Sequence, residues 1–288
     1  MRKIKIVNPA AGRGDAAKFA NNSDGVEIYY TKCIGDAERF CTETLLQNPK
    51  THFIVYGGDG TVNEVVNGIM NANANDSALF SVIPVGTGND LVKSFDGEGT
   101  IHEIDVIKYN DRYAVNVINI GFDCAVAGKA SKLKSLPLIN GSGAYIAGVV
   151  TSLAKHYGER IHVKLTTENG IIEFDDEYLI CVIGNCSFYG GGFKAAPLAE
   201  YDDGLLDVLL VKKMPRYKFL ALINDYRLGK HINPESMTPI DKFSKYATYV
   251  KCTAIDISDI ENICVDGEVG KVTDFHAEVL KRKVRIMI

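Results

Sequence analysis

Asp59 lies among glycines in the run Gly57-Gly58-Asp59-Gly60-Thr61, directly after the four strand-forming residues Phe53-Ile54-Val55-Tyr56. Glycines let the oxygen atoms of a phosphate approach the backbone closely, and a following helix N-terminus favours negative charge. A carboxylate in such a loop makes sense if a divalent cation lies between it and the phosphate. The run therefore predicts a phosphate site with a metal ion, and its alternative interpretation is a plain strand-to-helix turn.

The segment Pro84-Val85-Gly86-Thr87-Gly88-Asn89-Asp90 repeats this arrangement after a second apolar run. Asn89 or Asp90 could simply cap a following helix. The functional interpretation is that Thr87 contacts a nucleotide and that Asp90 organises a metal ion or water.

Two acidic segments follow later in the chain. Asp202-Asp203-Gly204 is typical of a turn, but carboxylates in a turn also bind Mg²⁺. In Asp266-Gly267-Glu268 the two acids share one face of an extended strand. Beside a substrate hydroxyl one of them could act as a general base, whereas in a surface hairpin the segment would be an ordinary turn.

Gly12-Arg13-Gly14-Asp15-Ala16-Ala17 matches the dinucleotide pattern G-x-G-x-x-A, with Asp36 about 20 residues further on. Polar Asn8-Pro9 precedes these glycines, and Asp36 begins a helix pattern instead of ending a strand. We therefore disfavour a dinucleotide site, and a P-loop NTPase is disfavoured because the chain has no Walker A sequence.

The elements that position these residues alternate in the first third of the chain. Strands are expected at 3–7, 26–30, 52–56 and 79–85, and helices at 12–21, 36–47 and 61–73. Thr61 and Glu64 have the spacing of a capping box for the third helix. This order predicts an α/β fold with a parallel sheet, in which the polar loops converge at one sheet edge, where ligands bind.

After about residue 100, short β-rich runs separated by turn signals predict a mostly antiparallel domain. The expected strands are 101–107, 112–121, 160–167, 171–175, 177–184, 205–211, 250–257, 262–265, 275–280 and 283–288, with helices at about 142–157 and 215–229. We expect one domain at 1–98 and another at 99–282, because Asp96-Gly97-Glu98-Gly99 is a polar glycine stretch. The final strand, at about 283–288, could return to the first domain.

Composition excludes several classes of protein. The 288 residues are 46% hydrophobic and 24% charged, an ordinary globular balance, and the net charge of -4 argues against a nucleic-acid partner. Seven cysteines without a C-x-x-C pair favour a reduced, cytoplasmic setting. No signal peptide is apparent at the N-terminus, and no apolar stretch reaches the ~18 residues of a membrane span, so a lipid substrate would be met at the membrane surface.

Taken together, these motifs resemble the diacylglycerol kinase catalytic-domain family, in particular its soluble bacterial lipid kinases. The resemblance rests on the segments described above together with Asn8-Pro9-x-x-Gly12 and Asn63-Glu64-Val65. It implies ATP-dependent phosphorylation of a lipid hydroxyl, diacylglycerol being the first candidate. It also implies an ATP-binding α/β domain, a lipid-substrate β-sandwich domain similar to that of NAD kinases, and a possible homodimer.

The resemblance also implies roles for individual residues, with ATP and Mg²⁺ as cofactors. Glu268 would accept the proton, with Asp266 beside it. Asp203, with carbonyl groups near Glu200 and Leu205, would hold a structural Mg²⁺, and Asp59, Asp90 and Asp123 would join its network. The residues expected at ATP are Asn8, Pro9, Gly12, Thr31, Gly57, Gly58, Asp59, Gly60, Thr61, Asn63, Glu64, Gly86, Thr87, Gly88 and Asn89.

Two other functions are left open by the motifs. NAD kinases share a Gly-Gly-Asp-Gly loop and a similar two-domain plan, and a catalytically inactive nucleotide- or lipid-binding module would keep the same landmarks. Lys129, Lys132 and Lys134 are either a solvated face or a contact with anionic lipid headgroups.

Overall fold

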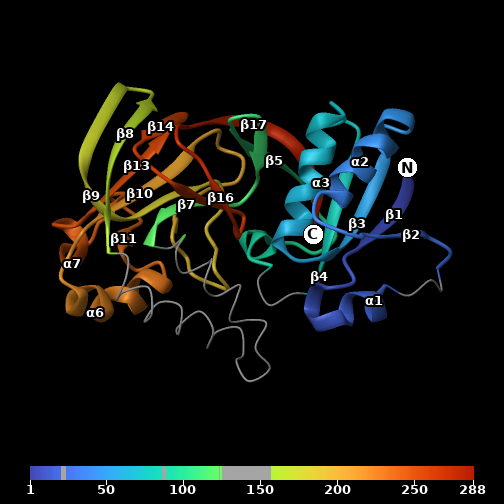
Figure 1. The fold of residues 1–288 in the computed structure, drawn as a ribbon, viewed down its shortest axis with the longest axis horizontal. Coiled ribbons are helices and arrows are strands. Elements are labelled where there is room, and N and C mark those ends of the chain that lie inside the picture. Colours follow the sequence, from blue (N-terminus) through green and yellow to red (C-terminus); the bar gives the residue numbers. More distant parts are fainter. Residues whose placement is uncertain (21–23, 86–88, 123, 125–156) are drawn as a thin grey trace.

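The computed structural model describes residues 1–20, 24–85, 89–122, 124 and 157–288. Two lobes lie side by side along the long axis of the molecule (Figure 1). The N-terminal lobe contains β1 to β4 with their helices, and the C-terminal lobe contains β5 to β17.

The N-terminal lobe is built on four parallel strands in the order β4-β3-β1-β2. Their apolar side chains fill the core, with Ile4, Phe53 and Phe80 fully buried. The helices α2 and α3 pack on one face of the sheet, and the short α1 lies on the other. The bounds are β1 Arg2–Val7, η1 Ala11–Gly14, α1 Asp15–Phe19, β2 Glu27–Tyr30, α2 Asp36–Gln47, β3 Thr51–Gly57, α3 Asp59–Asn71, β4 Leu79–Pro84 and η2 Leu91–Ser94.

The C-terminal lobe is mostly antiparallel. Its larger strands are β5 Ile101–Tyr109, β6 Arg112–Ala114, β7 Val117–Gly121, β8 Glu159–Thr167, β9 Gly170–Gly184, β10 Leu206–Lys212, β13 Ala247–Cys252, β14 Ala254–Ser258, β15 Asn262–Val265, β16 Glu268–Lys271 and β17 Phe275–Met287. The small pieces are β11 Ile232–Asn233 and β12 Thr238–Pro239, and the helices among the described residues are α6 Arg216–Arg227 and α7 Asp241–Ser244.

Strand β10 shows how alternation builds the layers of this lobe. Successive side chains of a strand point to opposite faces. Val208 and Leu210 enter a core shared with β8 and β14, while Leu209 and Val211 pack under α6 and α7. One layer of strands is therefore buried on both faces, which explains its nearly continuous apolar sequence.

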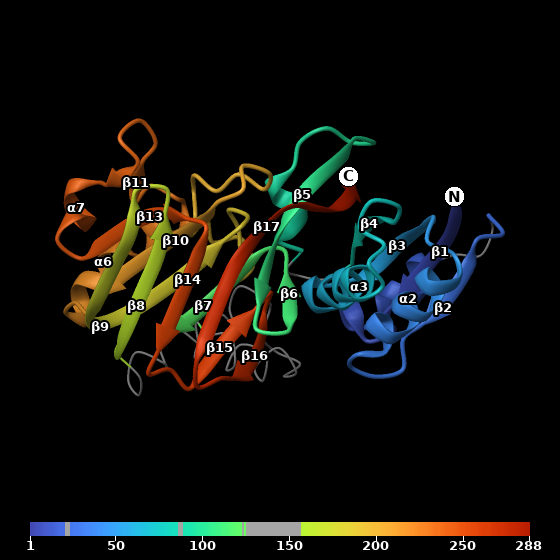
Figure 2. The same ribbon diagram turned by 90° about the horizontal axis from the view of Figure 1, so that it is seen from above.

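The long strand β17 joins the two lobes. It runs antiparallel to β5 over most of its length, and its end pairs in parallel with β4 through Ile286 and Met287. Figure 2 shows β17 and β5 between the lobes, so the last residues of the chain lie beside the first domain's sheet.

Several expected elements differ from the structure. The first helix is only η1 and α1, the runs 171–175 and 177–184 form the single strand β9, and 275–280 and 283–288 form β17. The runs 112–121 and 250–257 are each divided in two. The expected helix at about 142–157 falls outside the described residues except at its last position, which is not helical.

Candidate active site

The four parallel strands end together at one edge of the N-terminal sheet, as the loop positions predict. Asn8 Nδ2 donates to Thr61 Oγ1 at 3.1 Å, and the backbone N–H of Thr31 donates to the Val7 carbonyl at 2.9 Å. Gly12 lies against the carbonyl of Val85, where a Cβ would overlap it, and has a φ of +60°. The described residues that follow β1, β2, β3 and β4 therefore meet at this edge of the sheet, which we call the rim.

Asp59 begins α3, directly after Gly57 and Gly58. A Cβ on Gly57 would lie 2.6 Å from the Thr61 side chain, so the tight turn requires glycine. The N-cap position is Gly58, and no side chain caps the helix. The first N–H groups of an α-helix have no intrahelical acceptor, so the start of α3 offers free donors to an anion.

Asp59 and Asp90 form the acidic part of the rim. Asp59 Oδ1 accepts the backbone N–H of Asp90 at 3.1 Å, and Asp90 itself pairs with Lys93 and accepts the N–H of Gly191 at 2.7 Å. Burial raises the pKa of Asp59 to about 7, with further contributions from Asp90 and from the more distant Asp266. Too little positive charge surrounds this carboxylate to stabilise its ionised form. A cation that arrived with a phosphate would supply that charge.

Glu268 reaches this rim from the other lobe. It begins β16, and a Cβ on Gly60 would overlap its Oε1, so the carboxylate lies against the first turn of α3. Burial raises the pKa of Glu268, and the nearby Glu64 raises it further, while Arg112 opposes the shift. A raised pKa lies closer to the operating pH, where a general base is most efficient.

Asp266, two residues before Glu268, has a different role. Its carboxylate accepts three backbone N–H groups, from Val115, Asn116 and Val117, at 3.1 Å each. It also accepts Asn63 Nδ2 at 2.8 Å. Asp266 is almost fully buried, and burial raises its pKa despite these bonds. Because every bond is to the protein, Asp266 is a positioning residue that locks the Glu268 hairpin onto α3.

The side chains of α3 that follow Thr61 also bind protein groups. Asn63 donates to the Tyr113 carbonyl and to Asp266, and the neighbouring Asn67 exchanges hydrogen bonds with Tyr113. Glu64 accepts the backbone N–H groups of Gly35 and Ala37 at 2.9 and 3.0 Å, at the start of α2. The expected Thr61–Glu64 capping box is therefore wrong, because α3 begins two residues earlier and Glu64 caps its neighbour.

The acidic turn at Asp203 is held by its own hydrogen bonds and by a basic side chain. Asp203 Oδ2 pairs with Lys251 Nζ at 2.7 Å, and Asp203 Oδ1 accepts the N–H of Leu205 at 2.9 Å. Among the described residues, no group of three His, Cys, Asp or Glu side chains is placed to hold a metal ion. The expected set of Asp203 with carbonyl groups near Glu200 and Leu205 stays a prediction, because it needs only one carboxylate side chain.

Several residues that the sequence places at the site are not among the described residues. Gly86, Thr87, Gly88 and Asp123 lie outside the described residues, as do the three lysines at 129, 132 and 134. Pro9 is exposed at the rim, and Asn89 is buried beside Asp90 with a φ of +49°.

The sequence analysis did not identify three kinds of hydrogen-bond or ion-pair partner. They are the amide of Asn67, the basic Lys93 and Lys251, and the backbone N–H of Gly191, which donates to Asp90. Two local signals could have found some of them: the repeat Asn63-x-x-x-Asn67, which puts two amides on one helix face, and the i,i+3 spacing of Asp90 and Lys93.

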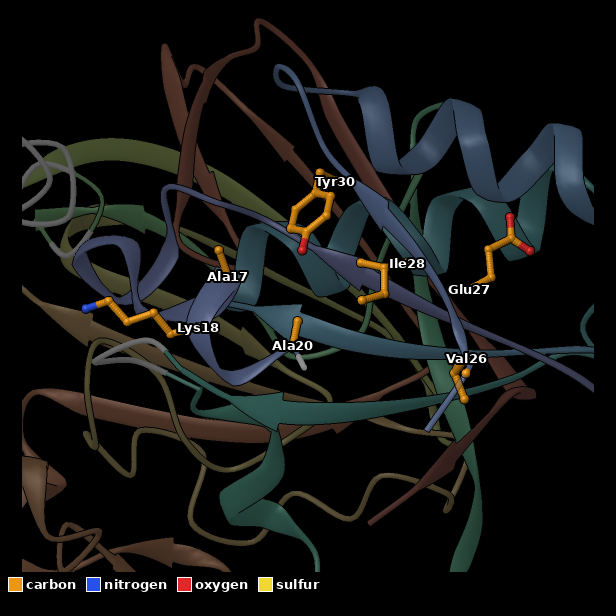
Figure 3. A pocket seen from close by; sticks show the side chains of 8 residues that line it. Ala17, Lys18, Ala20, Val26, Glu27, Ile28 and Tyr30 are labelled. Carbon is orange, nitrogen blue, oxygen red and sulfur yellow. The ribbon is translucent and has the colours of Figure 1, made fainter. Parts of the chain in front are cut away.

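A separate pocket of 690 Å³ opens between α1 and the edge strand β2. Ile28 and Tyr30 line one side of it, and Ala17, Lys18 and Ala20 line the other (Figure 3). None of the expected site residues lines this pocket, so the candidate active site is the rim at the strand ends and not this hollow.

Comparison with known proteins agrees with the geometry. The model of the diacylglycerol kinase catalytic domain matches residues 3–120, and that of the YegS C-terminal NAD kinase beta sandwich-like domain matches residues 116–288. The chain belongs to the diacylglycerol kinase catalytic-domain family. The two matches overlap at residues 116–120, which include most of β7 in the C-terminal lobe.

Named relatives of this kinase family cover much of the chain. A diacylglycerol kinase of Staphylococcus epidermidis is 32% identical over 92% of this chain and 85% of its own length. One of Bacillus subtilis is 26% identical over 100% and 97%. A probable YegS-like lipid kinase of Shewanella frigidimarina is 30% identical over 68% of this chain and 65% of its own length.

Solved structures show the same fold. A putative diacylglycerol kinase from Bacillus anthracis superposes with a TM-score of 0.73 at 24% identity, covering 99% of this chain and 96% of that one. The two-lobed α/β architecture, with a parallel N-terminal part and an antiparallel C-terminal part, is therefore confirmed. Within the described residues, no helix combines the length and apolar character needed to cross a bilayer.

Proposed function

We propose that this member of the lipid kinase family transfers the γ-phosphate of ATP, supplied with Mg²⁺, to a hydroxyl group of a lipid. Diacylglycerol, which would give phosphatidic acid, is the acceptor proposed first. The observation that carries the proposal is the position of Glu268, a carboxylate of one lobe that lies against the start of α3 in the other; we assign that helix start to the phosphates of ATP.

The N-terminal rim supports the nucleotide half of this proposal. The free N–H groups and dipole at the start of α3 suit the negative charge of phosphates. Asp59, whose pKa burial raises to about 7, is the carboxylate best placed to face the Mg²⁺ that enters with ATP. That ion supplies charge neutralisation for the transferred phosphoryl group, and the residues supply position, which accounts for most catalysis of this reaction type.

Glu268 supports the acceptor half. As the lipid hydroxyl oxygen forms its bond to the γ-phosphorus and the bond to the β-γ bridging oxygen breaks, the hydroxyl proton goes to a Glu268 oxygen and ADP leaves. Asp266 and Asn63 keep the hairpin in register with α3 through the 2.8 Å bond between them. The two lobes must therefore stay docked for the base and the phosphate site to face each other.

The test is the conservative variant Glu268→Gln, which keeps the shape of the side chain and removes the base. We expect turnover to fall by about 10²- to 10⁴-fold, the usual contribution of a general base, with an unfolding midpoint no lower than that of wild type. The matched control is Glu173→Gln on the exposed part of β9, which should keep full activity. Turnover of Glu268→Gln within a few-fold of wild type would exclude Glu268 as the base.

We also propose that the protein meets its lipid at a membrane surface through α6. Three apolar side chains are exposed on one face of this helix, Tyr217 at 75%, Leu220 at 49% and Leu228 just after it at 45%. Arg216 and Arg227, the first and last residues of α6, are exposed along one edge of that face. An apolar stripe with a basic edge fits an anionic interface, to which each basic residue contributes about 1 kcal/mol.

A further inference from the structure

A short hairpin of the C-terminal lobe reaches across to the acidic part of the rim. Tyr189 and Phe193 exchange two backbone hydrogen bonds, at 2.9 and 2.8 Å, and three glycines form the turn between them. The backbone N–H of the middle glycine, Gly191, donates to Asp90 Oδ2 at 2.7 Å. We call the segment Tyr189–Phe193 the clasp, because it connects the two lobes at this point.

The clasp holds the part of the rim that adjoins Asp59. Asp90 is only 2% exposed, and its Oδ1 pairs with Lys93 Nζ at 2.5 Å. The backbone N–H of Asp90 donates in turn to Asp59 Oδ1 at 3.1 Å. Hydrogen bonds to an ionised acceptor are stronger than those between neutral groups. Loss of the Gly191 N–H would therefore release the Asp90 carboxylate and disturb the Asp59 carboxylate beside it.

The other end of the clasp is bound to α6. Tyr189 and Tyr226, which lies on α6, share a hydrogen bond between their hydroxyl groups at 2.9 Å, and both side chains are buried. The rings of Phe193 and Tyr226 lie 6.0 Å apart. Directly after the clasp, the N–H of Lys194 donates to the carbonyl of Arg227, the last residue of α6, at 3.0 Å. The C-terminal end of α6 therefore sets the position of the hairpin.

We propose that the clasp is a positioning element that fixes the Asp90 carboxylate from the C-terminal lobe and so ties α6 to the acidic part of the rim. The proposal rests on the proposed function in one respect, since it takes the rim as the place where a nucleotide binds with its metal ion. The contact between Asp266 and Asn63 holds the base, whereas the clasp acts on the nucleotide half of the site. Gly191 and Tyr226 are thus positioning residues that act through Asp90.

The first experiment removes the donor and keeps the hairpin. Deletion of Gly191 leaves a two-residue Gly-Gly turn, which is a favoured hairpin loop, and eliminates the N–H that Asp90 accepts. Gly191→Ala is the conservative variant, because it keeps the N–H and a Cβ there meets nothing within 4 Å. The dissociation constant of ADP is measured by isothermal titration calorimetry for each full-length protein, once in MgCl₂ and once in EDTA.

The comparison of the two conditions separates positioning of the acids from a general loss of structure. We expect the deletion to raise the dissociation constant of ADP in MgCl₂ about tenfold, the contribution of one hydrogen bond to a charged group, and to change that in EDTA much less. Gly191→Ala should restore the affinity in MgCl₂. No change in MgCl₂, or an equal change in both conditions, would overturn the proposal. Wild type that binds no ADP in either condition would instead refute the proposed function.

A second measurement tests the link to α6 and needs no nucleotide. Amide hydrogen exchange is followed in the segment 89–95 for Tyr226→Leu, which removes the hydroxyl and the ring beside the clasp. Tyr246→Leu is the matched control, because it removes a tyrosine whose hydroxyl accepts Lys218 Nζ of the same helix at 3.2 Å. We expect faster exchange in 89–95 for Tyr226→Leu alone, since a segment opens more often when the contacts that hold it are lost. A rise in both variants, or in neither, would overturn the proposal.

Discussion

Asp59→Asn should make the protein more stable while it removes activity. Burial, with Asp90 and Asp266 as further causes, raises the pKa of Asp59 to about 7 from its ordinary value of 3.8. The native state therefore holds the Asp59 proton more tightly than the unfolded state does. Asparagine has no proton to lose, so the variant escapes the cost of ionising this buried group.

The sign and size of the effect follow from linkage. Between pH 3.8 and about 7 the native protein binds more protons at Asp59 than the unfolded chain, so its free energy of unfolding falls as pH rises. Each pH unit between the two pKa values corresponds to about 1.4 kcal/mol, which sets an upper bound of about 4 kcal/mol. Because solvent reaches part of the Asp59 side chain, we expect the variant to gain about 1–3 kcal/mol at pH 8.

The assay is urea unfolding of wild type and Asp59→Asn at pH 5 and pH 8, without Mg²⁺ or nucleotide. The variant should be the more stable protein at pH 8, and the difference should shrink at pH 5. Asp76→Asn, at an exposed aspartate, should show no such dependence. If Asp59→Asn is less stable than wild type at pH 8, or if the difference is the same at both values, the reasoning about an uncompensated carboxylate is refuted.

Three further predictions concern other parts of the molecule. Asp266→Asn should lower the free energy of unfolding by about 3–5 kcal/mol, because an amide nitrogen would face N–H donors in a buried site; a change below 1 kcal/mol in urea unfolding would contradict this role. Gly60→Ala should stabilise α3 by helix propensity, yet its Cβ would displace the Glu268 carboxylate. Steady-state turnover should therefore fall at least about tenfold, and unchanged turnover would show that the contact between Gly60 and Glu268 does not matter for catalysis. Tyr217→Ser with Leu220→Ser should weaken co-sedimentation with phosphatidylglycerol vesicles about tenfold or more, whereas Ile171→Ser, equally apolar and 59% exposed on β9, should not; equal loss in both would remove α6 as the docking face.

The sequence predicted those parts of the site that depend on neighbouring residues. A glycine turn between an apolar strand and a helix pattern placed Asp59 correctly at the start of α3. Strand order then brought Asn8, Thr31 and Thr61 to one edge, because parallel strands end on the same side of a sheet. These inferences needed only local periodicity and the handedness of α/β connections.

The parts that could not be predicted depend on contacts between distant residues. Asn63 and Asp266 are 203 positions apart, and no local pattern shows that this acid accepts four N–H groups while Glu268 beside it reaches the rim. Likewise, nothing near Asp203 in the sequence indicates that Lys251, on β13, forms an ion pair with it. Acidic turns look alike in sequence, and their charge partners decide what they can bind.

The predicted strand lengths were wrong for a related reason. The expected break between 280 and 283 corresponds to the register shift in β17, where Lys281 and Arg282 turn toward the acidic turn while the strand continues. A bulge interrupts the alternation of apolar residues without ending the strand, so the sequence pattern alone reads it as two strands.

The central claim is tested most directly with γ-labelled ATP, Mg²⁺ and detergent-dispersed total lipid extract, resolved by chromatography, for wild type and Asp59→Asn. We predict a labelled lipid with the mobility of phosphatidic acid that is absent with the variant. Label in NAD⁺ and not in lipid, or no label in any lipid while ATP still binds, would contradict the assignment of this protein as a lipid kinase.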